Sequence, residues 1–574
     1  MTEHEHYEAI VVGCGPGGAT AAATLARNGV ETLVLERGVE AGSKNVSGGV
    51  IYAEESAPYT IDDLFPDFRE AASERPITHN YIHNIAGEKV KTFDLTDIHE
   101  HDTEWADAVL RRKMDSHLER RVHELTRETG GGVLTGVHAN GLYREDSEGR
   151  ARPSNESSGQ SPRDGEIVGV TTDELEPITG DLIVAADGVN SELARDAGLM
   201  DWDEPDEWFQ GVKAIVDMPE GAIEERFDIA ADRGETHLFS GDLYEGVRGG
   251  GFLYTNESTL SIGNVFHLDS IVEERAEVVD LLDALLTHPL LAQWIGGDEY
   301  EELEYSAKLV PDSKKVAHPS PTEGRLVLVG DAAGQMQAQG PLIKGMNHAV
   351  TAGALVGEAF AVARSRGDTA TAGERYVKKL YDEGVMAKIR PAAYDQSRKV
   401  TEHRRAASLT DRLVESSVGR AGLDVLVNSG AVERLYNSPR MMQVLPDTTT
   451  PYATLPTAIA ERHGERITEE STVEPPTLEE RIGDLTYDTD IGNPHIVVED
   501  DSWEASGAAV TACPVSAKGF GGGCYREEVR SNGHEERVVS FDSQPCVECG
   551  TCAIVADTTW THPRGGKGVE FEQG

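Results

Sequence analysis

The hydrophobic pattern near the start of the chain predicts a strand, a tight turn, a helix and a second strand. Residues 7–12 form an apolar run, residues 16–27 are rich in alanine, and residues 32–35 form another apolar run. Short apolar runs bounded by glycine are typical of buried parallel strands, which are joined by helices. Two further apolar runs, at 182–186 and 326–329, end in the same way. The sequence therefore predicts an α/β domain whose strands come from distant parts of the chain.

A different pattern dominates the middle of the chain, where apolar and polar positions alternate. The segments GVKAIVDM, ETHLFSGDL, GGFLY and TLSIGNVFHL lie between residues 210 and 268. Alternation with a period of two is typical of strands that bury one face. We therefore expect an antiparallel sheet on the substrate side of the molecule, at about residues 205–310.

The first turn carries a glycine motif that predicts a dinucleotide site. Gly13 permits a tight turn, Gly15 lets the backbone approach a pyrophosphate, and Gly18 allows close packing of helix and strand. The helix N-terminus offers unpaired N–H groups to the phosphates. Glu36 closes the second strand, where a carboxylate accepts hydrogen bonds from a ribose. We predict that these four residues and the adjacent Arg37 bind the cofactor.

Asp187 and Gly188 follow one of the later strands, and Gly330 and Asp331 follow the other. Together with the glycine turn, these motifs resemble the flavoprotein monooxygenases and reductases of the hydroxybenzoate hydroxylase type. The resemblance implies a Rossmann-like FAD-binding domain. It also implies that Asp331 binds the ribitol and pyrophosphate region of FAD and that Arg111 lies beside the cofactor.

A helix farther along completes the predicted flavin site. The stretch QGPLIKGMNHAVTAG indicates a loop that leads into a helix near Gly345 and Met346. Because a helix N-terminus carries a partial positive charge, we expect this one to stabilise negative charge on the reduced flavin ring.

Five of the six cysteines lie close to the end of the sequence. Cys546, Cys549 and Cys552 have the spacing that wraps three thiolates around an iron–sulfur cube, which needs one more ligand. Cys513, followed by proline, is the predicted fourth ligand of a 4Fe-4S cluster, and Cys524 is the alternative. Zinc is the competing metal because CxxC pairs bind it too, in which case the segment would be a docking module.

Charge narrows the choice of function. The chain has 52 Lys and Arg against 101 Asp and Glu, a net charge of -49, which argues against a nucleic-acid binder. Molar salt shortens the Debye length to about 3 Å, so such a surface suits a very salty cytosol. We expect a halophilic, haloarchaeal source; an acidic protein from a mesophile is the alternative.

With both kinds of cofactor motif in one chain, the sequence resembles electron-transfer-flavoprotein:quinone oxidoreductase and the related FixC and FixX proteins. GSKNVSGGVIYAE, VLRRKMDSHL and THPLLAQWIGGDEYEELEYSAKLVP are similar to FixC, whereas CVECGTC and THPRGGKGVEFEQG resemble FixX. The chain is identified as a FixC–FixX fusion. The expected domains are a FAD-binding oxidoreductase domain at 1–444, an acidic Pro- and Thr-rich connector at 445–489 and a ferredoxin-like 4Fe-4S domain at 490–574.

The resemblance implies a redox relay. An electron transfer flavoprotein similar to FixA and FixB would be the donor, FAD and the 4Fe-4S cluster would hold the electrons, and a membrane quinone would accept them. Such a relay needs no acid–base pair, so we predict no catalytic residue. The rival function is a FAD-dependent geranylgeranyl reductase, which saturates isoprenoid lipids and has no use for a cluster.

A quinone acceptor places the protein on the cytoplasmic face of the cell membrane, as a peripheral protein. No stretch approaches the roughly 18 apolar residues of a spanning helix. Residues 278–295 have apolar positions at helical spacing and fit either an interfacial helix or a core helix.

Overall fold

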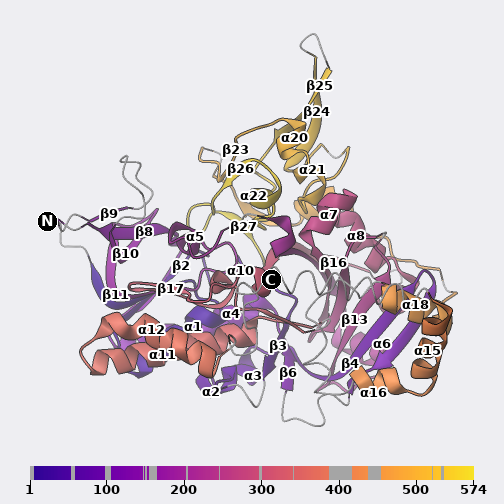
Figure 1. Cartoon of the computed structure of the whole chain (residues 1–574), viewed down its shortest axis with the longest axis horizontal. Helices are drawn as coiled ribbons and strands as arrows, with labels where there is room; N and C mark the ends of the chain where they lie inside the picture. The colour runs from indigo at the N-terminus through magenta and orange to yellow at the C-terminus, as the bar shows by residue number, and fades with distance from the viewer. Residues whose placement is uncertain are drawn as a thin grey trace.

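The chain consists of two large sheets with helices on their outer faces and a smaller C-terminal part that packs on both (Figure 1). The computed structural model describes residues 5–53, 58–96, 105–146, 148, 151–153, 165–201, 204–244, 246–296, 300–339, 342–384, 386, 416–436, 454–468, 470–490, 492–519, 521–531 and 535–574.

The first sheet has a parallel core, as the sequence predicts. Its order is β7-β2-β1-β11-β10-β8-β9, and β18 pairs in parallel with one end of β11 and antiparallel with β17. Its strands are β1 (His6–Val12), β2 (Thr32–Glu36), β7 (Gly132–Thr135), β8 (Ala139–Glu145), β9 (Ala151–Pro153), β10 (Glu166–Thr172), β11 (Ile178–Ala185), β17 (Thr322–Glu323) and β18 (Leu326–Leu328).

Three helices pack together on one face of this sheet: α1 (Pro16–Arg27), α4 (Arg111–Glu128) and α11 (Met346–Ser365). In Figure 1, α11 lies beside α1 although more than 300 residues separate them in the sequence. Glycine makes the approach close: a Cβ on Gly353 of α11 would lie 2.2 Å from the carbonyl oxygen of Gly17. The contact fixes α11 against the helix that follows the glycine turn.

The second sheet contains the strands predicted from the alternating segments. Its order is β16-β12-β15-β14-β13-β4-β5-β21, and every pair is antiparallel except β13 with β4. That parallel pair brings an early strand into a sheet that the sequence placed at about 205–310. The strands are β4 (Arg75–Ala86), β5 (Lys89–Asp94), β12 (Trp208–Asp217), β13 (Gly234–Asp242), β14 (Gly249–Thr255), β15 (Thr259–His267), β16 (Glu302–Pro311) and β21 (Glu465–Arg466).

Residues 278–295 form two short helices, α8 (Val278–Leu286) and α9 (Pro289–Ile295), which pack in the core and are not an interfacial helix. Their apolar side chains are buried against the second sheet, so the core alternative is the one that the structure adopts. Among the described residues, no single helix has the length and apolarity to cross a membrane; α8 and α9 pass that test only as a pair bent by 69°.

The segment predicted as a connector contributes to the second sheet. In its described part, α18 (Thr454–His463) packs on β4 and β13, and β21 pairs with β5; residues 445–453 lie outside the described residues. The other helices are α2 (Ile61–Leu64), α3 (Phe68–Ala71), α5 (Glu192–Asp196), α6 (Glu220–Phe227), α7 (Leu268–Glu274), α10 (Ser313–Val316), α12 (Ala372–Asp382), α15 (Ser417–Asn428), α16 (Ala431–Tyr436) and α19 (Leu478–Gly483). β3 (Val50–Ala53) pairs with β6 (Trp105–Ala108), which also pairs with β4 and so belongs to the second sheet. β19 (Gln337–Gln339) and β20 (Leu342–Lys344) form a separate antiparallel pair.

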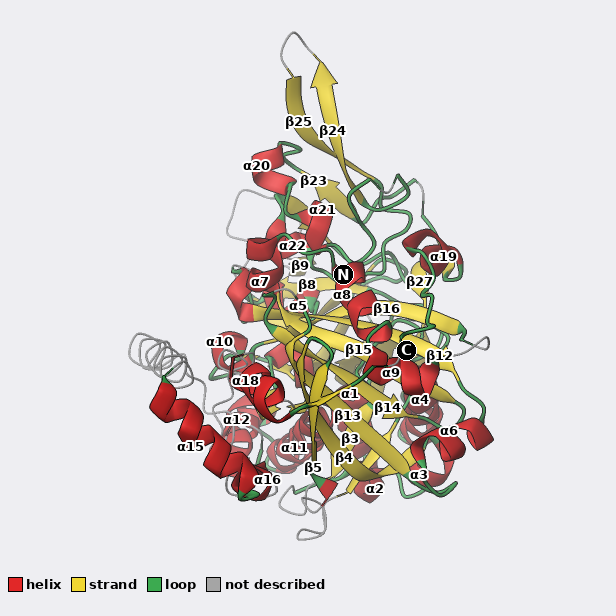
Figure 2. Ribbon diagram, turned by 90° about the vertical axis from the view of Figure 1, so that its right-hand side faces the viewer, coloured by secondary structure: helices red, strands yellow, loops and turns green. Residues whose placement is uncertain are grey.

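Residues 486–574 form what we call the C-terminal module. Its three strand pairs are β22 with β27, β23 with β26, and β24 with β25, and the last pair projects as a hairpin (Figure 2). The first strand of the module therefore lies inside the predicted connector. The elements are β22 (Thr486–Asp488), β23 (Ile496–Val498), α20 (Trp503–Ser506), α21 (Ala509–Ala512), β24 (Tyr525–Ser531), β25 (Glu535–Phe541), α22 (Cys552–Val555), β26 (Thr558–Trp560) and β27 (Gly568–Glu570).

Candidate flavin and cluster site

A cavity of about 350 Å³ lies where the first sheet, the second sheet and the C-terminal module meet. Its wall includes all the residues predicted to bind FAD except Gly18, although they come from six separate segments. The predicted residues on the wall are Gly13, Gly15, Glu36, Arg37, Arg111, Asp187, Gly188, Gly330, Asp331, Gly345 and Met346.

The glycine turn has the geometry that the motif predicts. Gly13 has a φ of +92°, and a Cβ there would lie 2.4 Å from the carbonyl oxygen of Ala186. Gly18 is absent from the cavity wall because it packs inside the turn, where a Cβ would lie 1.9 Å from the carbonyl oxygen of Gly13. The turn is therefore a cradle that larger side chains would fill, as close approach of a pyrophosphate requires.

Glu36 has a structural role that the motif did not reveal. One carboxylate oxygen accepts the N–H of Cys14 at 2.8 Å and the other accepts the N–H of Gly38 at 2.7 Å. Burial raises the pKa of Glu36. The carboxylate thus fixes the loops on both sides of the cavity floor, and its remaining lone pairs are available to a ribose.

The two aspartates lie buried in the cavity wall. Burial raises the pKa of Asp187 to about 6, and its Oδ1 atom has no hydrogen-bond partner among the described residues. Asp331 faces the start of α11, since a Cβ on Gly345 would lie 3.7 Å from its Oδ1. Arg111 is held by Asp115 at 2.6 Å, with its guanidinium directed at the glycine turn. The unpartnered Oδ1 of Asp187 and the glycine cradle fit a dinucleotide.

Three buried lysines that lie on the cavity wall were not identified from the sequence. Lys44, Lys213 and Lys308 all donate to backbone carbonyls of the C-terminal module: Lys44 to Val569 at 2.6 Å, Lys308 to Glu548 at 3.1 Å and Lys213 to the carbonyl of the last residue. Burial lowers the pKa of each lysine to about 8. The residues around each lysine do not indicate its partner, because that partner lies more than 200 residues away in the sequence.

The five clustered cysteines are all buried and none forms a disulfide. Cys524 lies within hydrogen-bonding reach of Cys513 and Cys546, and burial together with these contacts raises its pKa. Cys546 accepts the N–H of Glu548 at 3.3 Å, and Cys549 lies 3.4 Å from the hydroxyl of Thr551. The structure thus brings the four predicted ligands and the alternative into one cluster of thiols.

Among the described residues, no three His, Cys, Asp or Glu side chains converge on one position suited to a single metal ion. A tetrahedral zinc site requires such convergence. A cube differs, because each of its four cysteines binds a different iron and the sulfurs stand farther apart. The chemistry and grouping of the thiols fit a cube.

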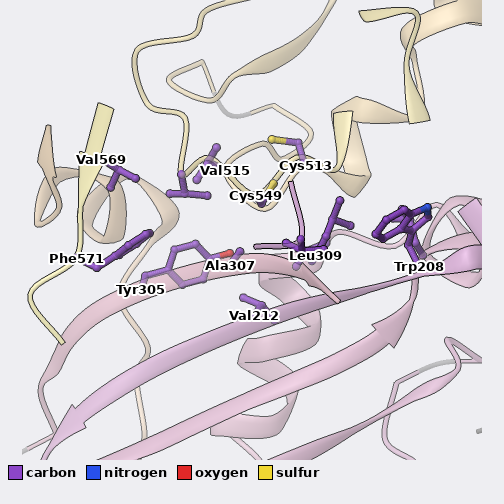
Figure 3. Close-up of a cluster of buried hydrophobic side chains, with 14 of the residues drawn as sticks. Trp208, Val212, Tyr305, Ala307, Leu309, Cys513, Val515, Cys549, Val569 and Phe571 are labelled. Carbon is purple, nitrogen blue, oxygen red and sulfur yellow. The ribbon is translucent and has the colours of Figure 1, made fainter. Parts of the chain in front are cut away.

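The segment Cys546–Cys552, which we call the cysteine loop, packs directly on β16, a strand that also lines the cavity. Figure 3 shows Cys513 and Cys549 above Ala307 and Leu309 of β16, in one apolar cluster with Trp208. The backbone oxygen of Cys549 accepts the N–H of Leu309 at 3.4 Å, and Leu309 also lines the cavity.

Asn190 directly connects the two predicted cofactor sites. Its side-chain amide donates to the carbonyl oxygens of Glu548 and Cys549, each at 3.2 Å, and it follows Asp187 by three residues. The fit is tight, because a Cβ on Gly550 would lie 2.5 Å from its Oδ1. One side chain therefore touches both the cavity and the cysteine loop.

The chain is similar to known proteins over about two thirds of its length. The chain is 32% identical over 404 residues to protein FixC of Salmonella typhi, covering 69% of this chain and 87% of that protein. It is 31% identical over 388 residues to the probable electron transfer flavoprotein-quinone oxidoreductase YdiS of Escherichia coli (strain K12), covering 67% of this chain and 83% of that protein. No family model matches the chain.

A solved structure shows the same fold. It is a geranylgeranyl bacteriochlorophyll reductase-like protein of Thermoplasma acidophilum, with a TM-score of 0.51 and 16% sequence identity, covering 80% of this chain and 97% of that one. At this identity the likeness concerns the fold alone, which is α/β with mixed sheets.

Proposed function

Because this chain belongs to the FixC family, and is therefore an electron-transfer flavoprotein oxidoreductase, we propose that it carries electrons from a reduced electron transfer flavoprotein to a membrane quinone. The proposed path uses FAD in the cavity and a 4Fe-4S cluster in the C-terminal module. When bound, FAD stores two electrons and the cluster passes one at a time, so that one-electron and two-electron partners can be joined.

The observation that carries the proposal is the contact between the cysteine loop and the cavity wall. Asn190 and Leu309 each line the cavity and each bond to the backbone of Cys549. An enzyme that only passes hydride from its flavin to a substrate gains nothing from this contact. A relay gains a short and fixed separation between its two carriers.

The residues of the cavity have distinct roles in this proposal. Gly13 and Gly15 let the pyrophosphate approach the backbone, and the carboxylate of Glu36 accepts hydrogen bonds from the ribose. The N-terminus of α11 at Gly345 provides partial positive charge for the flavin ring. The side chain of Lys213 is buried in the wall of the same cavity.

The thiols of the C-terminal module have the second role. Cys513, Cys546, Cys549 and Cys552 would hold the cluster, and burial in the shared apolar core shields it from water. Hydrogen bonds such as that from the N–H of Glu548 to Cys546 are a known means of tuning cluster potential.

Electron transfer in a purified, anaerobic preparation tests the proposal. Reduced electron transfer flavoprotein and a short-chain quinone should give quinol at a rate that depends on this protein. Iron and acid-labile sulfide should each reach about four per chain, with an EPR signal after reduction by dithionite. Saturation of geranylgeranyl lipid without quinone reduction would instead support the reductase alternative. One zinc and no sulfide per chain would support the docking module.

A further inference from the structure

We propose that the C-terminal module completes the adenosine end of the FAD pocket, so that FAD binding and docking of the module stabilise each other. The inference rests on FAD binding, which the proposed function requires, but it concerns a separate property of the pocket. The inference is based on a group of contacts at one end of the cavity. Neither electron transfer nor cluster binding explains these contacts.

Glu36 marks the adenosine end of the cavity. In a dinucleotide site, the acidic residue that closes the second strand binds the ribose next to the adenine. Arg37 follows it, and the N–H of Val137 donates to the carbonyl oxygen of Glu36 at 3.0 Å, which places His138 beside it. All four residues line the cavity.

His562 of the C-terminal module lines the same end. Its ring meets that of His138 edge to face at 5.8 Å, and its backbone N–H donates to the carboxylate of Glu192 at 2.7 Å. The Nδ1 atom of His562 is shielded from water and has no hydrogen-bond partner among the described residues. A buried polar atom without a partner is costly unless a ligand supplies one.

Glu548 links the module to Arg37. Its carboxylate, 1% exposed, pairs with one Nη atom of Arg37 at 2.8 Å, and its other oxygen accepts the N–H of Val569 at 3.0 Å. The second Nη atom of Arg37 is buried and has no partner among the described residues. The arginine is thus oriented by the module and retains a free donor on the cavity wall.

The carboxylate of Glu548 holds this position at a conformational cost. The backbone φ of Glu548 is +54°, in the left-handed region that non-glycine residues rarely adopt. The backbone carbonyl of Arg37 also accepts the N–H of Gly566 at 2.8 Å. Two separate stretches of the module therefore converge on the residue that follows Glu36.

The energetic consequence is reciprocal. Undocking the module would remove His562 from the pocket and leave Arg37 without its carboxylate, so FAD would bind more weakly. By linkage, FAD must stabilise the docked module by the same factor.

The test uses the full-length apoprotein and two variants, Glu548→Gln and His562→Ala. We expect the Kd for FAD, measured by equilibrium dialysis, to rise about tenfold or more in each, as is typical when a buried partner is removed. We also expect FAD to slow proteolysis within the C-terminal module of the native protein, and to do so less in the variants by a similar factor.

Glu499→Gln is the matched control, because Glu499 lies in the same module and its side chain accepts a hydrogen bond from the exposed Thr559 at 2.9 Å. Iron content reports any disturbance of the cysteine loop by Glu548→Gln, and His562→Ala stands clear of that loop. A Kd within about twofold of the native value in the His562 variant would overturn the inference. Absence of FAD binding by the native protein would overturn the proposed function itself.

Discussion

At the scale of single residues, His138 makes stability depend on pH. Burial alone lowers the pKa of His138, but hydrogen bonds to Asp173 and Glu192 raise it to about 9. Because this value exceeds the ordinary 6.5, the folded state holds the proton more tightly than the unfolded state. The stabilisation is complete below about pH 6.5 and is lost as the pH rises to about 9.

We therefore expect His138→Gln to remove a contribution on the order of 3 kcal/mol to the free energy of unfolding at pH 6. The measurement is denaturant unfolding of both proteins between pH 6 and 9.5. The buried lysines with pKa values of about 8 act in the opposite direction above pH 8, so the difference between the two proteins is the quantity to follow. Equal pH slopes would show that His138 is not the source.

The fourth cluster ligand is a second question at this scale. We expect Cys513→Ser to lower bound iron to a small fraction of the native content, whereas Cys524→Ser should retain most of it. Each variant removes one buried thiol from the same cluster of cysteines, so the two serve as controls for each other. Iron loss in the Cys524 variant alone would reverse the assignment.

Single residues were predictable where a motif specifies backbone geometry. Gly13 and Gly18 of the first turn belong to this class, because a Cβ at either position would clash with backbone atoms. Glu548 and Asn190 were not predictable, because their importance comes from contacts more than 350 residues apart in the sequence. No local pattern records such a contact.

At the scale of elements, the contact between α1 and α11 fixes the flavin cavity. We expect Gly353→Ala to destabilise the protein by about 1–3 kcal/mol, because the added methyl group would overlap the carbonyl of Gly17. Thermal unfolding measures the loss, and bound FAD per chain shows whether the glycine turn is also displaced.

Gly422→Ala is the control for this substitution. It also lies within a helix, α15, but a Cβ there meets no atom within 4 Å. Alanine should therefore leave stability unchanged or raise it by up to about 1 kcal/mol. Similar losses in both variants would indicate a general effect of helix substitution.

Periodicity predicted the elements well where one face is buried, as in the second sheet. It left residues 278–295 open between a core helix and an interfacial helix, because both present an apolar stripe. The choice follows from packing, since these helices cover the second sheet. The parallel pairing of β13 with β4 likewise depends on the whole fold.

At the scale of the whole molecule, Glu304 anchors the last residues of the module. Its carboxylate accepts the N–H groups of Glu572, Gln573 and Gly574 at 2.6, 2.9 and 2.8 Å. We expect Glu304→Gln to weaken this anchor by about 2–4 kcal/mol, because an amide offers one acceptor and no charge. Hydrogen exchange at residues 571–574 should become faster.

The control is Glu301→Gln. Glu301 immediately precedes β16, the strand that carries Glu304, and its side chain is exposed. Exchange at 571–574 should stay at the native rate in this variant. An unchanged rate in Glu304→Gln as well would show that other contacts suffice to hold the segment.

The lysines that bond to the module have a consequence for synthesis on the ribosome. Lys44 and Lys213 find their carbonyl acceptors only in residues 566–574, which emerge after nearly all of the chain. Before that segment is synthesised, the ammonium groups of Lys44 and Lys213 lie in an incompletely folded interior and lack these acceptors. The nascent N-terminal domain should therefore remain loose until the module has been synthesised.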